Sequence, residues 1–243
     1  MSNKDLAFKT ALVTGASSGL GAATAFAFAK AGYAVASLDI DATKIEQLSC
    51  DCGREVGYSC DVSNAQEVAR TVAAVLDEFG RIDVAVNCAG IDHTYPLEEL
   101  TVEQFDQVIA VNLRGPFLIA KAVWPAMKRQ GGGHIVNVAS TAAVRAWSGA
   151  SAYHASKFGL LGFGRGLSAE GRRDGICVTT LIPGGMRTRF FDRFAEQGIP
   201  LPDPATLQDP ADVAETILFT VSRPAGSVIQ ELVVTPPNEP SWP

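Results

Sequence analysis

The feature that most constrains the fold is a glycine-rich turn between an apolar run and a helical pattern near the N-terminus. Residues 10–14 (TALVT) are rich in strand-forming types, residues 15–21 (GASSGLG) follow at once, and residues 22–32 (AATAFAFAKAG) have helical character. Strand, glycine turn and helix in this order begin a βαβ unit. Gly32 is expected to end the helix, and the chain returns to a second buried strand that ends at Asp39. The two strands are therefore expected to be parallel, with a right-handed crossover.

The same alternation continues along the chain. Further strands are expected at about residues 55–60, 82–86, 134–140, 176–182 and 227–234, and helices at about 41–48, 64–79, 101–129, within 140–157 and at 210–222. Ser63 is a candidate N-cap for the helix that Gly80 ends, and Thr101 for the long helix, which Pro116 and Pro125 are expected to kink or break. Parallel strands that are buried on both faces are expected to be apolar in this way. We predict an α/β fold with seven strands.

Two segments depart from this alternation. Residues 186–209 contain several prolines with mixed charged and aromatic residues, which indicates a flap over a site. Residues 235–243 (TPPNEPSWP) cannot form a helix and are expected to lie extended against the domain or a partner subunit. No repeat or linker divides the sequence. Residues 1–243 are therefore predicted to be one domain.

Composition excludes several classes of protein. The chain is 47% hydrophobic and 19% charged, which is typical of a globular protein and not of a disordered one. Its net charge of −6, without a long Lys/Arg cluster, gives no footprint for nucleic acid or anionic lipid. No run reaches the roughly 18 apolar residues of a membrane span, and no apolar signal segment stands at the start. The five cysteines lack the paired spacing of a zinc site, so no metal is predicted. We expect a cytoplasmic protein that binds neither nucleic acid nor membrane.

The glycine turn and Asp39 together indicate a dinucleotide. Gly15, Gly19 and Gly21 would let the backbone approach a pyrophosphate, whose charge a helix N-terminus favours. A packing turn is the alternative. Asp39 could accept hydrogen bonds from both hydroxyls of an adenosine ribose and repel a 2′-phosphate. No Arg or Lys occupies the glycine turn or the two positions after Asp39, so NAD is favoured over NADP. The alternative is that Asp39 only caps the helix after it.

A possible proton-transfer unit lies between Ser140 and Lys157. Tyr153 and Lys157 stand four residues apart, so in a helix they share a face and bring an ammonium beside a phenol. Ser140 would approach that face from the preceding strand. A surface pair with an unrelated serine is the alternative. Ligands of an open parallel sheet bind beyond the carboxyl ends of its strands, where further candidates follow: Asp61, Asn87, Gly90 and Pro183.

Six motifs in order resemble the short-chain dehydrogenase/reductase family: TGASSGLG from Thr14, NCAG from Asn87, VN from Val111, Ser140, YHASK from Tyr153 and PGGMRT from Pro183. The resemblance covers about residues 8–234. It implies a Rossmann-type, doubly wound parallel sheet with helices on both faces, a nicotinamide cofactor, and a homodimer or homotetramer. Cys88 replaces the family's second asparagine and is expected to face the packed side of the sheet. The double glycine of the family's last strand is missing.

The resemblance also assigns roles. Asn112, Ser140, Tyr153 and Lys157 match the catalytic tetrad. Tyr153 would be the general acid/base, with its pKa lowered from about 10 by Lys157 and an oxidised nicotinamide. Ser140 would bind the substrate oxygen, and Asn112 would hold a water that links Lys157 to solvent. The expected cofactor-binding residues are Gly15, Ser17, Ser18, Gly19, Leu20, Gly21, Asp39, Ile40, Asp61, Val62, Asn87, Ala89, Gly90, Tyr153, Lys157, Pro183, Gly184, Met186 and Thr188.

The substrate is less well specified. The expected contacts are His93, Trp147 and Phe190, with Ser140 and Tyr153, and they belong to a wider apolar and aromatic set that favours a carbon-rich alcohol or ketone: Thr94, Tyr95, Val144, Met186, Phe191 and Phe194. Ordinary packing of the flap is the alternative. His154 would project about 100° away from Tyr153 around the helix and is expected to pack.

The leading hypothesis is an NAD-dependent oxidoreductase for a secondary alcohol or ketone. The alternatives are an NADP-linked 3-oxoacyl-thioester reductase and a non-catalytic oligomer that senses a dinucleotide.

Overall fold

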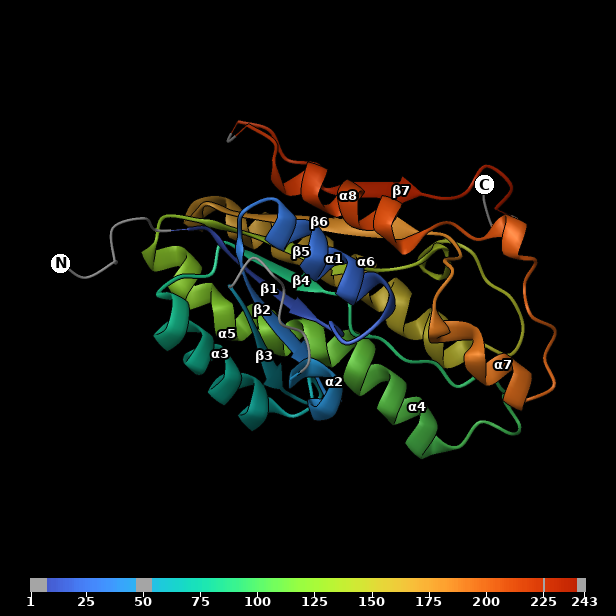
Figure 1. Cartoon of the computed structure of the whole chain (residues 1–243). Coiled ribbons are helices and arrows are strands. Elements are labelled where there is room, and N and C mark those ends of the chain that lie inside the picture. Colours follow the sequence, from blue (N-terminus) through green and yellow to red (C-terminus); the bar gives the residue numbers. More distant parts are fainter. Residues whose placement is uncertain (1–7, 47–53, 225, 240–243) are drawn as a thin grey trace.

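The strands of the computed structural model, which describes residues 8–46, 54–224 and 226–239, form one parallel sheet (Figure 1). Its order is β3-β2-β1-β4-β5-β6-β7. The strands are β1 (Thr10–Thr14), β2 (Ala34–Asp39), β3 (Glu55–Ser59), β4 (Val84–Asn87), β5 (Gly133–Val138), β6 (Ile176–Pro183) and β7 (Glu231–Val234). Chain order reverses between β1 and β4, and a crevice opens at such a point beyond the strand ends. The predicted doubly wound, seven-stranded sheet is confirmed, with β7 shorter than the predicted 227–234.

Helices cover both faces of the sheet, as predicted. Helices α1 and α8 lie on one side, and α3 and α5 on the other (Figure 1). The helix bounds are α1 (Gly19–Lys30), α2 (Ala42–Glu46), α3 (Ala65–Phe79), α4 (Val102–Ile109), α5 (Gly115–Arg129), α6 (Ser151–Gly171), α7 (Asp192–Glu196) and α8 (Pro210–Val221). Residues 47 and 48 of the helix predicted at 41–48 lie outside the described residues.

Alternating strand residues fill two separate cores. In β1, Ala11 and Val13 pack with Phe28 of α1 and Ile217 of α8. Leu12 points to the other face and packs among residues of α3 and α5. All five of these side chains are fully buried, because successive residues of a strand point to opposite faces and this sheet is covered on both. The continuous apolar runs of the sequence are thereby explained.

Helix ends follow local hydrogen bonding. Gly80 ends α3 in the left-handed conformation (φ +74°), as predicted. The N-cap prediction for this helix was wrong by one residue: the Asn64 side chain accepts from the backbone N–H groups of the first turn, whereas the Ser63 hydroxyl donates to Asp61. Thr101 caps α4 with a reciprocal capping box, as predicted.

The helix predicted at 101–129 is divided. A π-helical turn, η1 (Ala110–Arg114), separates α4 from α5. Pro116 therefore stands in the first turn of α5, where a missing N–H costs nothing, while Pro125 lies inside α5. The break expected at Pro116 and Pro125 therefore falls earlier, at residues 110–114, and α5 continues through Pro125. The interruption includes Asn112, a residue predicted to be catalytic. Such π turns are frequent at functional sites.

The segment 140–157 is helical only in part. A short 3₁₀ turn, η2 (Thr141–Ala143), follows Ser140, and α6 begins at Ser151. A loop lies between them, in which Gly149 has a φ of +77°. Glycine reaches this conformation without a side-chain clash. Tyr153 and Lys157 still fall in the first two turns of α6.

The two ends of the predicted flap, residues 186–209, are held together by hydrogen bonds. Backbone bonds join Arg187 to Gln208 and Gln208 to Gly185. Between them lie the 3₁₀ turns η4 (Arg189–Phe191) and η5 (Pro204–Thr206) and helix α7. The tail turns back on the domain, where the carboxylate of Glu239 accepts from the N–H of Gly185 at 2.8 Å. Residues 240–243 of the tail lie outside the described residues.

None of the helices in the described parts of the chain is long and apolar enough to cross a membrane. Within the same residues, no group of three or more His, Cys, Asp or Glu side chains could hold a metal ion.

The close packing of α6 on the sheet can be tested with two glycines two residues apart. A Cβ at Gly164 would lie 2.2 Å from Oγ1 of Thr180 on β6, whereas one at Gly166 meets nothing within 4 Å. We expect Gly164→Ala to lower the free energy of unfolding by roughly 1–3 kcal/mol, as overpacking does. Gly166→Ala should raise it by about 0.5–1 kcal/mol. Chemical denaturation of both variants measures the difference, and equal effects would contradict the placement of α6.

Candidate active site

The glycine turn after β1 allows a close approach between backbones. Gly15 (φ +68°) lies against the chain after β4, where a Cβ would come within 2.9 Å of Cα and N of Ala89. A Cβ at Gly21 would lie 2.0 Å from the carbonyl oxygen of Gly15. The hydroxyl of Thr14 fixes the same crossing by accepting from the N–H groups of Cys88 and Ala89, both at 3.1 Å. A larger residue at either glycine would clash with backbone atoms and displace this turn.

Cys88 faces α1, as expected for the packed side of the sheet, with its Sγ 4.0 Å from Oγ1 of Thr24. It also forms part of the cavity wall. Burial raises the pKa of this thiol to about 12, so it is protonated near neutral pH.

Two carboxylates stand at the end of the cavity formed by β2 and β3. Asp39 accepts from the N–H of Ser17 in the glycine turn and from the N–H of Asp41, both at 3.0 Å. The second bond resembles the capping alternative, yet the carboxylate also lines the cavity. Asp61 accepts from the N–H and the hydroxyl of Ser63, each at 2.8 Å. Each carboxylate oxygen has two lone pairs, so both groups retain acceptor capacity toward a ligand.

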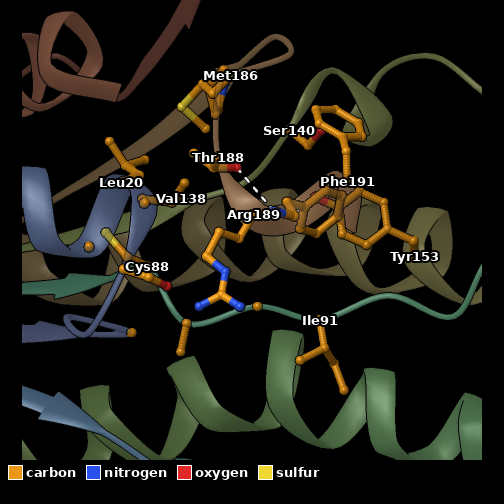
Figure 2. A pocket seen from close by; sticks show the side chains of 18 of the residues that line it. Leu20, Cys88, Ile91, Val138, Ser140, Tyr153, Met186, Thr188, Arg189 and Phe191 are labelled. Carbon is orange, nitrogen blue, oxygen red and sulfur yellow. Dashed lines mark hydrogen bonds between the residues drawn. The ribbon is translucent and has the colours of Figure 1, made fainter. Parts of the chain in front are cut away.

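A cavity of about 800 Å³ runs from these carboxylates along the strand ends to the flap. Figure 2 shows Leu20, Cys88 and Val138 on one side, Ser140, Tyr153 and Phe191 together on the other, and Thr188 and Arg189 between them. Most predicted site residues line it: Gly15, Ser17, Ser18, Gly19, Leu20, Gly21, Asp39, Ile40, Asp61, Val62, Ala89, Gly90, Ser140, Trp147, Tyr153, Lys157, Pro183, Gly184, Met186, Thr188 and Phe190.

Three predicted site residues do not line the cavity. Asn87 is buried in the sheet, where its amide donates to Oδ1 of Asn137 on β5 at 2.9 Å. His93 bonds to Oε1 of Gln107 at 2.9 Å, and Gln107 lines the cavity in its place. Asn112 is fully buried. Of the wider apolar set, Phe191 and Phe194 line the cavity, whereas Thr94, Tyr95 and Val144 do not.

Asn112 holds the loop after β4. Its Oδ1 accepts from the N–H of Ile91, and its Nδ2 donates to the carbonyl of Ile91 and to Oγ of Ser156. Both ends of the amide thus have protein partners, while Oδ1 keeps a second lone pair, so the expectation that Asn112 holds a water stays a prediction. The π-helical turn aims this side chain across the gap to the loop and α6.

Ser140, Tyr153 and Lys157 come together at the end of β5. Lys157 is buried with its Nζ 5.5 Å from the centre of the Tyr153 ring, and it donates to the carbonyl of Val138 at 2.9 Å. Although the Tyr153 ring is partly exposed to the cavity, desolvation raises its pKa to about 12, and a hydrogen bond with Ser140 opposes the rise. Desolvation lowers the pKa of Lys157 to about 8. A phenol, a hydroxyl and an amine are thus brought together at the cavity wall.

His154 makes contacts that the sequence pattern did not indicate. It packs, as expected, but its ring also joins two loops: Nε2 accepts from the N–H of Trp147, so Nδ1 carries the proton and donates to the carbonyl of Ala142, both at 3.0 Å. The ring also contacts Trp147 edge to face at 4.4 Å between centroids. His154 thereby ties the segment after Ser140 to Trp147 of the cavity wall.

Comparison with known proteins identifies the family of this chain. The family model described as short chain dehydrogenase matches residues 9–198. The chain belongs to the short-chain dehydrogenase/reductase family. It is therefore an oxidoreductase for alcohols or ketones with a nicotinamide dinucleotide as cofactor.

Individual relatives act on different molecules. The chain is 46% identical over 179 residues to a D-threitol dehydrogenase of Mycolicibacterium smegmatis, covering 72% of this chain and 69% of that one. A 3-ketoacyl-(acyl-carrier-protein) reductase of Brucella melitensis, solved with NADH, is 32% identical with a TM-score of 0.86 over 95% of this chain and 98% of that one. An alcohol dehydrogenase of Thermococcus sibiricus, solved with 5-hydroxy-NADP, is 30% identical with a TM-score of 0.84 over 95% and 97%.

We predict that His154→Phe weakens substrate use more than cofactor binding. The variant keeps a ring but loses both hydrogen bonds, each worth about 0.5–1.5 kcal/mol. We therefore expect kcat/KM to fall roughly tenfold while the Kd for the dinucleotide stays within about twofold, since one such bond corresponds to up to that factor. Steady-state kinetics and fluorescence titration measure the two quantities. His93→Phe is the matched control, and a larger effect there would restore His93 as a substrate contact.

Proposed function

We propose that this protein is an NAD-dependent oxidoreductase that interconverts a secondary alcohol and a ketone, with Tyr153 as general acid/base. The supporting observation is a single cavity with Ser140, Tyr153 and Lys157 at one end and the Asp39 carboxylate at the other. A dinucleotide joins two such chemically different ends. The glycine turn, residues 15–21, lines the cavity between these ends, and the N-terminus of α1 at Gly19 would favour the charge of a pyrophosphate there.

The residues at the chemical end would each act on the substrate oxygen or its proton. The bound nicotinamide supplies the hydride acceptor or donor. The Ser140 hydroxyl would orient the substrate oxygen, and Tyr153 would take its proton in oxidation or return it in reduction. In oxidation the phenol must lose its own proton first, which burial disfavours. A protonated Lys157 beside it stabilises the phenolate, so the two groups titrate as a coupled pair.

NAD is favoured by the charge at the adenosine end. Asp39 and Asp61 line this part of the cavity, and the cavity wall in the described residues carries no Lys or Arg other than Lys157 and Arg189. A 2′-phosphate would face the Asp39 carboxylate without a cationic partner in the glycine turn. The ribose hydroxyls, in contrast, could donate to that carboxylate.

The substrate end favours a carbon-rich molecule. Trp147, Phe190, Phe191 and Phe194 line it together with Ile91. Such walls stabilise apolar groups by burial, while Ser140 and Tyr153 supply polar contacts. This supports a secondary alcohol or ketone with an apolar substituent.

The NADP-linked 3-oxoacyl-thioester reductase is the second candidate, because a similar structure belongs to a 3-ketoacyl-(acyl-carrier-protein) reductase. Arg189, exposed at the cavity wall, could meet a phosphate of such a carrier. A non-catalytic, dinucleotide-sensing oligomer is disfavoured by the placement of Tyr153 beside a buried Lys157, which binding alone does not need. We further propose a cytoplasmic homo-oligomer, dimer or tetramer, since Phe117 and Phe158 leave apolar surface on α5 and α6.

Tyr153→Phe should lower turnover by roughly 10²-fold or more, because it removes the acid/base. In the wild type, alcohol oxidation should rise by about tenfold per pH unit below the apparent pKa of the Tyr153–Lys157 pair, since only the ionised phenol accepts the proton. Ketone reduction, which uses the neutral phenol, should not rise with pH. The pH dependence of kcat/KM in both directions measures this.

Lys157→Met is the control, since it removes the ammonium at similar length. Its oxidation profile should move to higher pH, because the phenolate loses a stabilising charge. Turnover by Tyr153→Phe at the wild-type rate would refute the assignment.

Asp39→Asn should reduce the preference for NAD. The amide keeps the shape and one acceptor oxygen but loses the charge that opposes a 2′-phosphate. We expect the wild type to bind NADH at least about tenfold more tightly than NADPH, and the ratio to fall toward one in the variant, a change of about 1.4 kcal/mol. Asp61→Asn is the matched control at the neighbouring carboxylate. Equal wild-type affinities for both dinucleotides would exclude the NAD assignment.

A further inference from the structure

The flap is joined to the body of the domain by a buried ion pair. Nη2 of Arg193, on α7, lies 2.9 Å from Oδ2 of Asp92, in the loop after β4. Only 20% of the Arg193 side chain and 4% of the Asp92 side chain are exposed. The flap's other two ion pairs among the described residues, Arg187–Asp209 and Arg189–Asp192, are about half exposed or more and lie within the flap or at its base. The pair of Arg193 and Asp92 is the one that reaches across to the β4 loop.

Neighbouring bonds strengthen this attachment. Thr94 donates its hydroxyl to Oδ2 of Asp92 at 2.9 Å, and its carbonyl accepts from the side chain of Gln197 at 3.4 Å. Oδ1 of Asp92 is buried and has no hydrogen-bond partner in the part of the chain that the structure describes. The Asp92 charge is therefore compensated mainly by Arg193.

Arg193 also holds an aromatic wall of the substrate end. Its guanidinium carbon lies 4.1 Å from the centre of the Phe190 ring and 5.0 Å from that of Phe194, and it donates to the carbonyl of Phe190. The Phe190 ring lies 5.5 Å from the ring of Tyr153. A continuous set of contacts thus runs from Asp92 through Arg193 and Phe190 to Tyr153.

We propose that Asp92 and Arg193 are positioning residues that hold the flap closed and fix Phe190 against Tyr153, so that they determine how a substrate is seated. The inference rests on the proposed function of this site and adds to it the attachment of the flap to the loop after β4. Neither residue lines the cavity. Their effect must therefore pass through Phe190 and through their charges.

The charges give the proposal a distinct signature. The charged groups that face Tyr153 are Lys157 on α6, Asp92 in the β4 loop and Arg193 on α7, with the Ser140 hydroxyl from the end of β5. Asp92 raises the pKa of Tyr153 and Arg193 lowers it. Removing Asp92's charge should move the alcohol-oxidation profile to lower pH, and removing Arg193's charge should move it to higher pH. A purely structural defect would move both profiles alike or not at all.

The test compares Arg193→Met, Asp92→Asn and the double variant with the wild type. Hydrogen exchange of peptides that cover residues 186–199 reports flap opening without any substrate. We expect exchange in each single variant to be at least about tenfold faster, because a buried charge that loses its partner is strongly destabilising. The double variant should change less than the sum of the two. KM should rise by roughly tenfold or more with a smaller change in kcat, as lost binding contacts predict, while the Kd for NADH is unchanged.

The controls separate this proposal from others. Arg165→Met breaks an exposed pair with Glu231, remote from the flap, and should leave exchange and kinetics unchanged. Arg193→Lys keeps the charge and should restore the pH profile more than the KM, since it loses the planar stacking. The proposal would be overturned if the flap exchanged hydrogen no faster in Arg193→Met and Asp92→Asn than in Arg165→Met. It would also be overturned if the two variants shifted the pH profile of alcohol oxidation in the same direction. If the wild type turned over no alcohol or ketone, the proposed function would fail, and flap exchange alone would decide the attachment.

Discussion

The close crossing of two backbones at the switch point of the sheet is the constraint on which the site depends. Gly15 lies against Ala89 because it has no Cβ, which would come within 2.9 Å of the Ala89 backbone. The Thr14 hydroxyl accepts from the N–H groups of Cys88 and Ala89 across the same crossing. This crossing forms part of the cavity wall, because Gly15 and Ala89 both line the cavity. The packing of α6 then decides where Tyr153 and Lys157 stand above it, since Gly164 lets that helix approach β6.

Local sequence signals predicted the parts of the fold that local physics determines. The strand, glycine turn and helix after Thr10, the left-handed stop at Gly80 and the capping box at Thr101 depend on neighbours within a few residues. The π-helical turn at Asn112 does not depend on near neighbours alone. There Oδ1 of Asn112 accepts from the N–H of Ile91, which lies twenty-one residues away in the sequence. Proline spacing indicated an interruption in that helix but could not indicate its geometry.

The candidate site likewise contains residues that local sequence signals could predict and residues that they could not. Residues that follow strands or stand one helical turn apart were predictable by position, and most of them line the cavity. His93 does not line the cavity as expected, and its ring bonds to Gln107, which does. Asp92 and Arg193 are separated by 101 residues and have no shared spacing, and the link from Glu239 to Gly185 spans 54. Such contacts exist only once the sheet brings the loops together.

An ion pair fixes the orientation of the flap more closely than apolar contact alone would. Replacing a buried pair with apolar residues is often neutral or stabilising, so stability does not require Asp92 and Arg193. An apolar contact, however, tolerates many orientations, whereas a guanidinium between one carboxylate, one carbonyl and two aromatic rings accepts few. The Phe190 ring is thereby fixed beside Tyr153. A defined wall at the proton donor is worth more to a hydride-transfer site than additional stability, because the substrate oxygen must be seated to within a fraction of an ångström.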